Sequence, residues 1–438
     1  MARQSIPIDI VHSIACGMDI HKEFLIAVIC DATDPDRPVF IKKRFSTFSK
    51  SLRELSDWLV ENHCFYVCME PTGNFWKPIF NVLEEKMVEV RICNPKWVKQ
   101  VKGEKDDTND AYWICNQYRL GLTRSSYIPA KDIRELRSLT RQKKKWREEI
   151  TSETNRAINV LVDHNYRLDM VFSSMNVKSA RKIISILVSK DSWTNEDILK
   201  CVHKRCKAAR EDILEAVKGI KLSEAMKYKL QAIMNHVDYL QNQLAEMHHE
   251  IDKLAEPHQE EIKALMTMPG VGRDAAICII AEIGTDMSEF KNPARLAKWA
   301  GLAPGSNESA GKKFSRSVTK AGKYLKPCLV QCAWAAVKAK VPYYLAKFNA
   351  ISRRAGKKRA IVAIARKMLT SIWAMLTYGS DWAPRDMTDS GYPRETTTKS
   401  AKNKLQHAIS DLACIGKSKE EITAVVTSII EAEAFVAS

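Results

Sequence analysis

The sequence predicts a mixed α/β sheet domain followed by an all-α remainder. Residues 14–93 alternate short β-rich runs with amphipathic stretches. Residues 222–256 place apolar side chains at alternating steps of four and three, which is typical of a long helix packed along one seam. Residues 261–380 have the pattern of a compact set of helices. The 438 residues, 45% hydrophobic and 28% charged, allow roughly two to four globular domains.

The N-terminal domain, residues 1–125, is predicted to begin with three strands joined by short turns. Later strands are separated by helices, so we expect an antiparallel meander continued by right-handed parallel crossovers. The strands are predicted at 14–20, 24–30, 38–46, 64–69 and 88–92, and the helices at 47–62 and 74–87. This order is the ribonuclease-H-like pattern.

A helical connector is predicted over residues 126–260. It contains one long helix at 131–165 and a second at 222–256. The coiled-coil seam of the second consists of Met226, Leu230, Ile233, Val237, Leu240, Leu244, Met247, Ile251 and Leu254. The two helices can pair within one chain or across a dimer, and the sequence leaves both arrangements open. Residues 166–221 are a helical insert without an assigned role.

A helical C-terminal domain is predicted over residues 261–380, with helices that include 294–300, 320–340 and 356–377. It begins with a helix–turn–helix that carries Met-Pro-Gly-Val-Gly at 268–272. Free backbone N–H groups in such a turn can contact a phosphate, but a tight corner between helices uses the same glycines. Both interpretations stay open. Residues 381–438 are expected to form a polar linker and a tail helix at 419–436.

The formal charge of +17 is concentrated in one block of the chain. Residues 309–380 contain no Asp or Glu and sixteen Lys or Arg, which gives this block +16 of the total. Solvated helix faces usually mix acids with bases, so the block predicts a groove for a polyanion. Its aromatic residues have helical spacing, which favours core packing over base stacking. The predicted nucleic-acid contacts are Lys105, Lys312, Lys313, Arg316, Lys320, Lys323, Arg353, Arg354, Lys357, Lys358 and Arg359.

Membrane, secreted and zinc-binding classes are disfavoured. The chain has no run of about 18 uncharged apolar residues, so the sequence predicts no membrane span. The first residues lack the basic start, apolar stretch and cleavage site of a signal peptide. The twelve cysteines include no CxxC pair, so we expect free thiols in a reducing cytoplasm and no structural zinc.

Four carboxylates form a candidate metal site. Asp19 ends the first predicted strand and Glu70 the fourth, at an edge of the sheet where they can converge. Asp107 and Asp110 are three residues apart and share one helix face. Carboxylate oxygens suit Mg²⁺, and two such ions can stabilise the attacking and leaving oxygens of phosphoryl transfer. Each acid alone also fits a turn, a helix cap or a solvated first helical turn.

These motifs resemble those of the DEDD transposases of the bridge-RNA-guided insertion-sequence family, whose N-terminal half is RuvC-like. The matching segments are GMDIHK around Asp19, MEPTG around Glu70, Asn94-Pro95, and KDDTNDA, in which Lys105, Asp107, Asp110 and Ala111 fit and Asp106 replaces the usual Thr. MPGVGRDAAICIIAEIG, FKNPARLAKWAGLAPGSNESAGK and TKAGKYLKPCL resemble the family's C-terminal domain. The resemblance covers about residues 13–125 and 261–378.

The resemblance implies that Ser309, in the Asn307–Lys312 segment, is a nucleophile that forms a phosphoserine link to DNA. It implies two Mg²⁺ ions per site, a non-coding bridge RNA that selects element and target DNA, and a homodimer or tetramer. In that assembly the acidic site of one subunit faces the serine of another. Rejoining through a covalent link needs no ATP, which fits the absence of a Walker-type loop from the sequence.

Three alternatives remain. A site-specific DNA invertase of the same family has the same sequence features. A RuvC-like Holliday-junction nuclease would hydrolyse DNA through the acids alone, with Ser309 a bystander. A non-catalytic architectural protein would use only the basic block.

Overall fold

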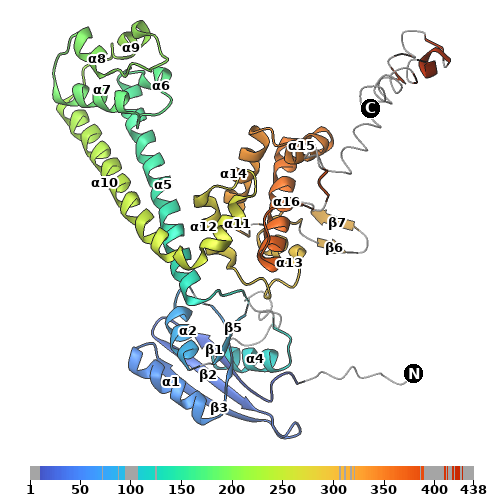
Figure 1. The fold of residues 1–438 in the computed structure, drawn as a ribbon. Helices are drawn as coiled ribbons and strands as arrows, with labels where there is room; N and C mark the ends of the chain where they lie inside the picture. The colour runs from blue at the N-terminus through green and yellow to red at the C-terminus, as the bar shows by residue number, and fades with distance from the viewer. Residues whose placement is uncertain are drawn as a thin grey trace. The chain divides into compact units, whose positions relative to one another are not determined.

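The computed structural model describes residues 10–93 except 72 and 87, residues 386–388, a few positions between 409 and 427, and most of 107–384. Within that last range the residues outside the description are 124, 125, 305, 306, 310, 311, 316, 317 and 320. The chain divides into two compact units, 1–128 and 129–438, which Figure 1 colours from blue to red and which we describe separately.

The first unit contains a five-stranded mixed sheet in the order β3-β2-β1-β4-β5. Strands β1, β2 and β3 are antiparallel neighbours, whereas β1, β4 and β5 run parallel. The bounds are β1 Ile14–Ile20, β2 Phe24–Asp31, β3 Val39–Ser46, β4 Tyr66–Met69 and β5 Glu89–Ile92. The predicted meander with parallel crossovers is confirmed, and the α/β-plus-helical layout with it.

Helices cover both faces of this sheet. On one face, α1 (Ser49–Glu61) and α2 (Trp76–Glu85) bury Leu55, Leu59 and Ile79 against Met18 and its neighbours. On the other face, α4 (Asp107–Arg119) packs Ile114 and Tyr118 against Ala15 and Cys68. Side chains alternate between faces along a strand, so Ala15 and Met18 belong to opposite cores.

The second unit begins with two long helices, α5 (Lys131–Asp163) and α10 (Glu224–Leu254). They pair within the chain and run antiparallel. His236 contacts Glu153 at 3.3 Å, His248 contacts Lys143 at 3.3 Å, and the following His258 contacts Asp132 at 3.1 Å. Residues further along α10 and η1 thus contact residues closer to the start of α5. The structure selects the intrachain arrangement, and a supercoil of the pair stays a prediction.

Four short helices form the insert between α5 and α10, at the end of this helical hairpin (Figure 1). They are α6 Leu168–Val171, α7 Lys178–Ser189, α8 Asn195–Cys201 and α9 Arg210–Ala216. A shared core includes Leu161, Ile183, Ile213 and Leu230, so the insert is built onto the ends of both long helices.

The rest of the second unit is a helical group around α16. Its bounds are η1 Glu256–His258, α11 Gln259–Met266, α12 Arg273–Ile283, α13 Pro293–Trp299, α14 Leu325–Lys338, α15 Pro342–Ala355 and α16 Lys357–Tyr378, with a hairpin of β6 Asn307–Ser309 and β7 Lys312–Ser315. By length and composition α16 passes as a membrane span. Its buried Ile364, Met368 and Ile372 face the packed helices, as in the core helix of a globular domain.

Candidate catalytic and nucleic-acid-binding sites

Two of the predicted acids stand side by side at the ends of neighbouring strands. Strands β1 and β4 pair in parallel, with Met18 opposite Met69, and the backbone N–H of Glu70 donates to Met18 O at 3.2 Å. Asp19 directly follows Met18 and Glu70 directly follows Met69, so the two acids lie at equivalent positions on neighbouring strands. Asp19 is 8% exposed, and its Oδ2 lies 3.0 Å from His21 Nε2. The sequence analysis did not predict this contact of His21, although its position two residues after Asp19 could have indicated it.

Gly17 brings α4 onto the same face of the sheet. A Cβ atom on Gly17 would overlap backbone atoms of Ala111 and Cys115 and would lie 2.7 Å from Cys115 Cα. Gly17 and Asp19 are two residues apart on one strand, so they share the face that α4 covers. The helix therefore approaches β1 as closely as backbone allows, on the side where Asp19 projects.

The direction of α4 puts its acidic end beside the strand ends. Its last residue, Arg119, accepts hydrogen bonds through its carbonyl from the N–H groups of Val11 and His12, just before β1 begins. The helix therefore runs opposite to β1, and its first turn lies toward Asp19. Asp110, half-buried, directly precedes the Ala111 that contacts Gly17. Three predicted acids are thus placed at one edge.

The fourth acid is only partly located. Asp107 begins α4 one turn before Asp110, but its side chain lies outside the described part of the chain, as do Lys105, Asn94 and Pro95. Among the residues described, no three His, Cys, Asp or Glu side chains gather closely enough to hold a metal ion. The metal site therefore stays a prediction.

The predicted nucleophile lies in a hairpin that sequence reasoning did not predict. Ser309, the last residue of β6, pairs with Lys312 across a two-residue connection. The Ser309 side chain and those of Lys312, Lys313, Arg316 and Lys320 lie outside the described part. The structure thus places the backbone of Ser309 beside the hairpin turn.

Two glycines close the base of this hairpin. Gly301 and Gly322 have φ of 66° and 70°. A Cβ on Gly301 would lie 2.9 Å from Ala321 C, and one on Gly322 would lie 2.8 Å from Ala300 C. Pro304 and Val318 then pair as an isolated bridge. These backbone approaches hold together the two chain segments that lead into β6 and out of β7. Only glycine combines the left-handed φ with the close approach.

Tyr324 attaches the segment after the hairpin to α5. The Arg141 guanidinium lies 4.5 Å from the ring centroid of Tyr324, and the Lys144 ammonium lies 5.0 Å from it. Lys144 also donates to Lys323 O at 3.3 Å. Arg141 in turn forms a two-bond pair with Glu282 of α12, at 2.7 and 2.8 Å. A cation over an aromatic face is attracted to it, so α5 holds the chain leading out of the hairpin.

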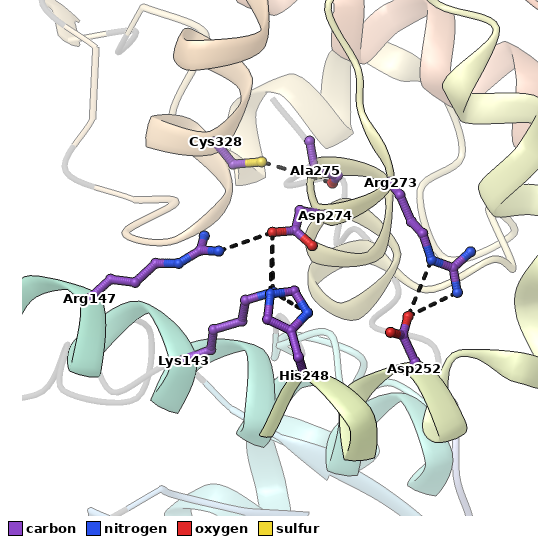
Figure 2. A network of polar contacts seen from close by, with 8 residues as sticks. All are labelled: Lys143, Arg147, His248, Asp252, Arg273, Asp274, Ala275 and Cys328. Atoms are coloured by element: carbon purple, nitrogen blue, oxygen red, sulfur yellow. Dashed lines mark hydrogen bonds and ion pairs between the residues drawn. The ribbon is translucent and has the colours of Figure 1, made fainter. Parts of the chain in front are cut away.

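A charged junction joins α5, α10 and α12. Figure 2 shows Lys143, Arg147 and His248 pointing toward Asp274, in the first turn of α12. Lys143 lies 3.2 Å and Arg147 3.1 Å from Asp274 Oδ2. Burial lowers the pKa of Lys143. Burial raises the pKa of Asp274, but the Lys143 charge and hydrogen bonds from both bases lower it further, to a net value below its usual range.

The glycine turn at 268–272 is a tight corner between helices. Gly270 has φ of 90°, and a Cβ there would lie 2.9 Å from Ala336 N of α14. Close backbone packing therefore explains this glycine. Gly272 caps α12 and has nothing within 4 Å of a built Cβ. The phosphate-binding interpretation receives no support beyond this open helix end.

The basic block is partly neutralised by the segment after α16. Asp386 accepts from Tyr343 Oη and Lys347 Nζ, both at 2.7 Å, and lies 3.3 Å from Lys367 Nζ. Burial raises the pKa of Asp386, but the hydrogen bonds from Lys347 and Tyr343 and the two lysine charges lower it more, to about 2. Trp382 stacks on Tyr344. The first residues of the predicted linker therefore pack on α15 and α16.

Five other basic residues remain exposed where α15 meets α16, and we call them the α15–α16 corner: Arg353, Arg354, Lys357, Lys358 and Arg359. Among the residues described, none of them has an ion pair with a carboxylate. Three of them occupy the first turn of α16, where the helix dipole disfavours positive charge by about 0.3–1 kcal/mol each. These three charges destabilise the helix when nothing is bound, and a bound anion would offset that cost. Tyr343, Tyr344 and Phe348 are buried, so the expectation of core packing is confirmed for them.

Comparisons with known proteins match two separate parts of the chain. The family model DEDD_Tnp_IS110, described as a transposase, matches residues 16–165, and the model described as "Transposase IS116/IS110/IS902 family" matches residues 262–349. The transposase for insertion sequence element IS1111A of Coxiella burnetii (strain RSA 493 / Nine Mile phase I) is 27% identical over 169 residues. That alignment covers 38% of this chain and 46% of that relative, so the chain spans about half the length of the curated relative it matches. The chain belongs to the IS110 family of DEDD transposases.

Proposed function

We propose that this chain is a Mg²⁺-dependent DNA transposase that mobilises its own insertion sequence in the cytoplasm through a phosphoserine intermediate. One observation carries the proposal. Asp19 and Glu70 end adjacent parallel strands, and the acidic first turn of α4 with Asp110 lies over the same sheet face. This arrangement occurs in a chain whose family is that of transposases.

The acids fit a magnesium site by their chemistry. Asp19, Glu70 and Asp110 offer only oxygen donors, as does Asp107, and hard divalent cations prefer such ligands. Asp19 is 8% exposed, and a buried carboxylate needs hydrogen bonds or positive charge to offset its lost hydration. These four residues would hold two Mg²⁺ ions. When bound, the ions supply Lewis-acid stabilisation of the attacking and leaving oxygens.

The serine step conserves phosphodiester bonds. The Ser309 Oγ attacks a backbone phosphorus, an Oγ–P bond forms, and one P–O bond of the DNA breaks. The serine proton passes to the acidic site, and the departing DNA oxygen takes up a proton there and leaves as a free hydroxyl. In the reverse step a hydroxyl end of the partner strand attacks the phosphoserine and releases Ser309. No external energy source is needed, because the number of phosphate ester bonds never changes.

Partners follow from charge and from the family resemblance. The α15–α16 corner, together with Lys105, Lys312, Lys313, Arg316, Lys320 and Lys323, would contact phosphates of element and target DNA. A bridge RNA would select those sequences by base pairing. A dimer or tetramer would bring the acids of one subunit to the serine of another.

The test is a search for covalent adducts. Full-length protein is incubated with Mg²⁺, labelled DNA that carries the element ends and target, and RNA transcribed from the element flank. On a denaturing gel we expect a protein–DNA adduct that maps to Ser309. Ser309→Ala abolishes both adduct and cleavage, whereas Ser315→Ala, at the end of the paired strand β7, retains both.

The same assay separates the alternatives. Cleavage at full rate by Ser309→Ala supports hydrolysis by the acids alone. Undiminished activity of Asp110→Asn, with the same DNA binding, supports a non-catalytic architectural role. Recombination of an invertible segment in preference to element ends identifies an invertase of the same family.

A further inference from the structure

The helical insert at the end of the α5–α10 hairpin carries a second concentration of basic charge. Residues 198–210 contain no acid. Lys204, Arg205, Lys207 and Arg210 in this stretch are all exposed, and Lys178 and Lys182 of the adjacent helix α7 are exposed as well. We call these six residues the hairpin-tip surface. The two family matches end at 165 and resume at 262, so they leave the whole insert between them.

We propose that the hairpin-tip surface binds the sugar–phosphate backbone of duplex DNA, as a contact separate from the α15–α16 corner. The inference extends the proposed function, in that it takes DNA as the substrate. It assigns a role to an insert that neither the acidic site nor the serine hairpin uses.

The loop from α8 to α9 is anchored so that its basic side chains point away from the core. Cys201, Val202, Cys206 and Ala208 pack against the hydrophobic core of the insert. The backbone N–H of His203 donates to Ser179 Oγ at 3.0 Å, which ties the loop to the start of α7. The exposed bases alternate with these anchors, so the backbone that carries them is held in place before any ligand arrives. Preorganised charges lose less entropy on binding.

Most other bases of the insert are already paired. Lys190 contacts Asp197, Lys200 contacts Glu196, Lys218 contacts Glu215, Lys221 contacts Asp191, and Arg181 contacts Asp238 of α10. In the described part of the chain, no carboxylate forms an ion pair with any residue of the hairpin-tip surface. The unpaired bases of the insert are thus limited to α7 and to residues 204–210, which His203 ties to the start of α7, and such clustering is the electrostatic pattern of a phosphate-binding patch.

Duplex backbone fits this surface better than single strands do. Proteins that hold single-stranded DNA or RNA stack its bases on aromatic rings. The segment 198–210 contains no Phe, Tyr or Trp, and the aromatic residues of the insert, Tyr166, Phe172 and Trp193, lie in its hydrophobic core or pack against it. Basic side chains without a neighbouring aromatic ring contact phosphates and do not stack on bases. The contact is therefore expected to be independent of the DNA sequence.

The insert lies at the end of α5 beyond the contact between α5 and α12. Arg147 contacts α12, and α5 continues for 16 residues beyond it to Asp163, which is about 24 Å at 1.5 Å per residue. This is about three times the screening length of ~8 Å at physiological salt. Substitutions in the insert are therefore expected to change the electrostatics of the junction between α5 and α12 very little.

The test compares two triple variants of the full-length chain that remove the same charge. Lys204→Gln/Arg205→Gln/Lys207→Gln removes unpaired bases, and Lys200→Gln/Lys218→Gln/Lys221→Gln removes paired ones. Binding of a duplex several turns long is measured by fluorescence anisotropy over a range of salt concentrations. We expect the first variant to lower the slope of log affinity against log salt by about 2–3, since each phosphate contact contributes about 0.9. The second is expected to lower it by less than about 1.

Equal effects of the two triples would overturn the proposal, because net charge alone would then explain binding. An unchanged slope in the first variant, or a loss seen with RNA but not with duplex DNA, would also overturn it. Matching thermal unfolding curves establish that both variants are folded. The assay requires no cleavage, so a failure of the phosphoserine mechanism leaves its result intact, and the reverse also holds.

Discussion

At the scale of single residues, Gly17 sets how closely α4, which carries Asp110, approaches the strand that contains Asp19. The backbone of Ala111 and Cys115 occupies the space that a side chain at Gly17 would need. We predict that Gly17→Ala pushes α4 away, lowers the free energy of unfolding by about 1–3 kcal/mol and abolishes cleavage, because Asp110 moves from the strand ends. Chemical denaturation and the cleavage assay measure the two effects.

Gly272→Ser is the matched control for this prediction. A side chain there meets nothing within 4 Å, and serine is a favoured residue at a helix N-cap. We expect unchanged or slightly higher stability. If Gly17→Ala unfolds at the same denaturant concentration as the parent chain, the close approach of α4 to β1 is wrong.

At the scale of elements, the pair between Arg141 and Glu282 joins α5 to α12. Glu282 is 3% exposed, and Arg141 is its charge partner. We predict that Arg141→Met costs about 3–5 kcal/mol of unfolding free energy, because it leaves a buried carboxylate without a counter-charge. Arg141→Met combined with Glu282→Leu is expected to recover most of the loss. A double-mutant cycle by denaturation checks this, and additive losses would contradict it.

The segment that carries Asp386 is predicted to release in acid. Its pKa of about 2 in the folded chain lies below the ordinary value of ~3.9, so the ionised form stabilises the fold. This stability is complete above about pH 4 and is lost as pH falls toward 2. Tryptophan fluorescence should report the separation of Trp382 from Tyr344 over that range. Asp386→Asn should lack this transition, and an identical titration of both proteins would count against the contact.

At the scale of the whole molecule, the basic residues of the block at 309–380 include some that are paired with an acid and some that are not. Lys347 and Lys367 are held by Asp386, whereas the α15–α16 corner is left open to an anion. We predict that Lys357→Gln/Lys358→Gln/Arg359→Gln weakens duplex binding and lowers its salt slope by about 2–3. Thermal stability should stay the same or rise, because three charges leave the positive end of a helix.

Titrations with duplex DNA and thermal unfolding test both parts of this prediction. The exposed Lys338→Gln/Lys340→Gln variant in the same basic block is a control for net charge. A drop in stability without a change in affinity would show that the corner serves the fold and not DNA.

The sequence by itself determined the strands and most helices of the first unit and the two long helices of the second. Alternation and heptad spacing predicted β1 to β5, α1, α2, α5 and α10 within a few residues, because those patterns lie among neighbours in the chain. The sequence also placed Asp19 and Glu70 at strand ends, which fixed their adjacency once β1 and β4 paired in parallel.

Tertiary structure alone decided the rest. In the folded chain α10 packs against α5, and Asp386 pairs with two lysines of the basic block. The backbone of α4 lies directly against Gly17. The tertiary structure also built the serine hairpin from the backbone contact between the glycine turns at Gly301 and Gly322. These contacts join residues that are far apart in sequence, and they form only when the remaining packing is in place. No local periodicity encodes them.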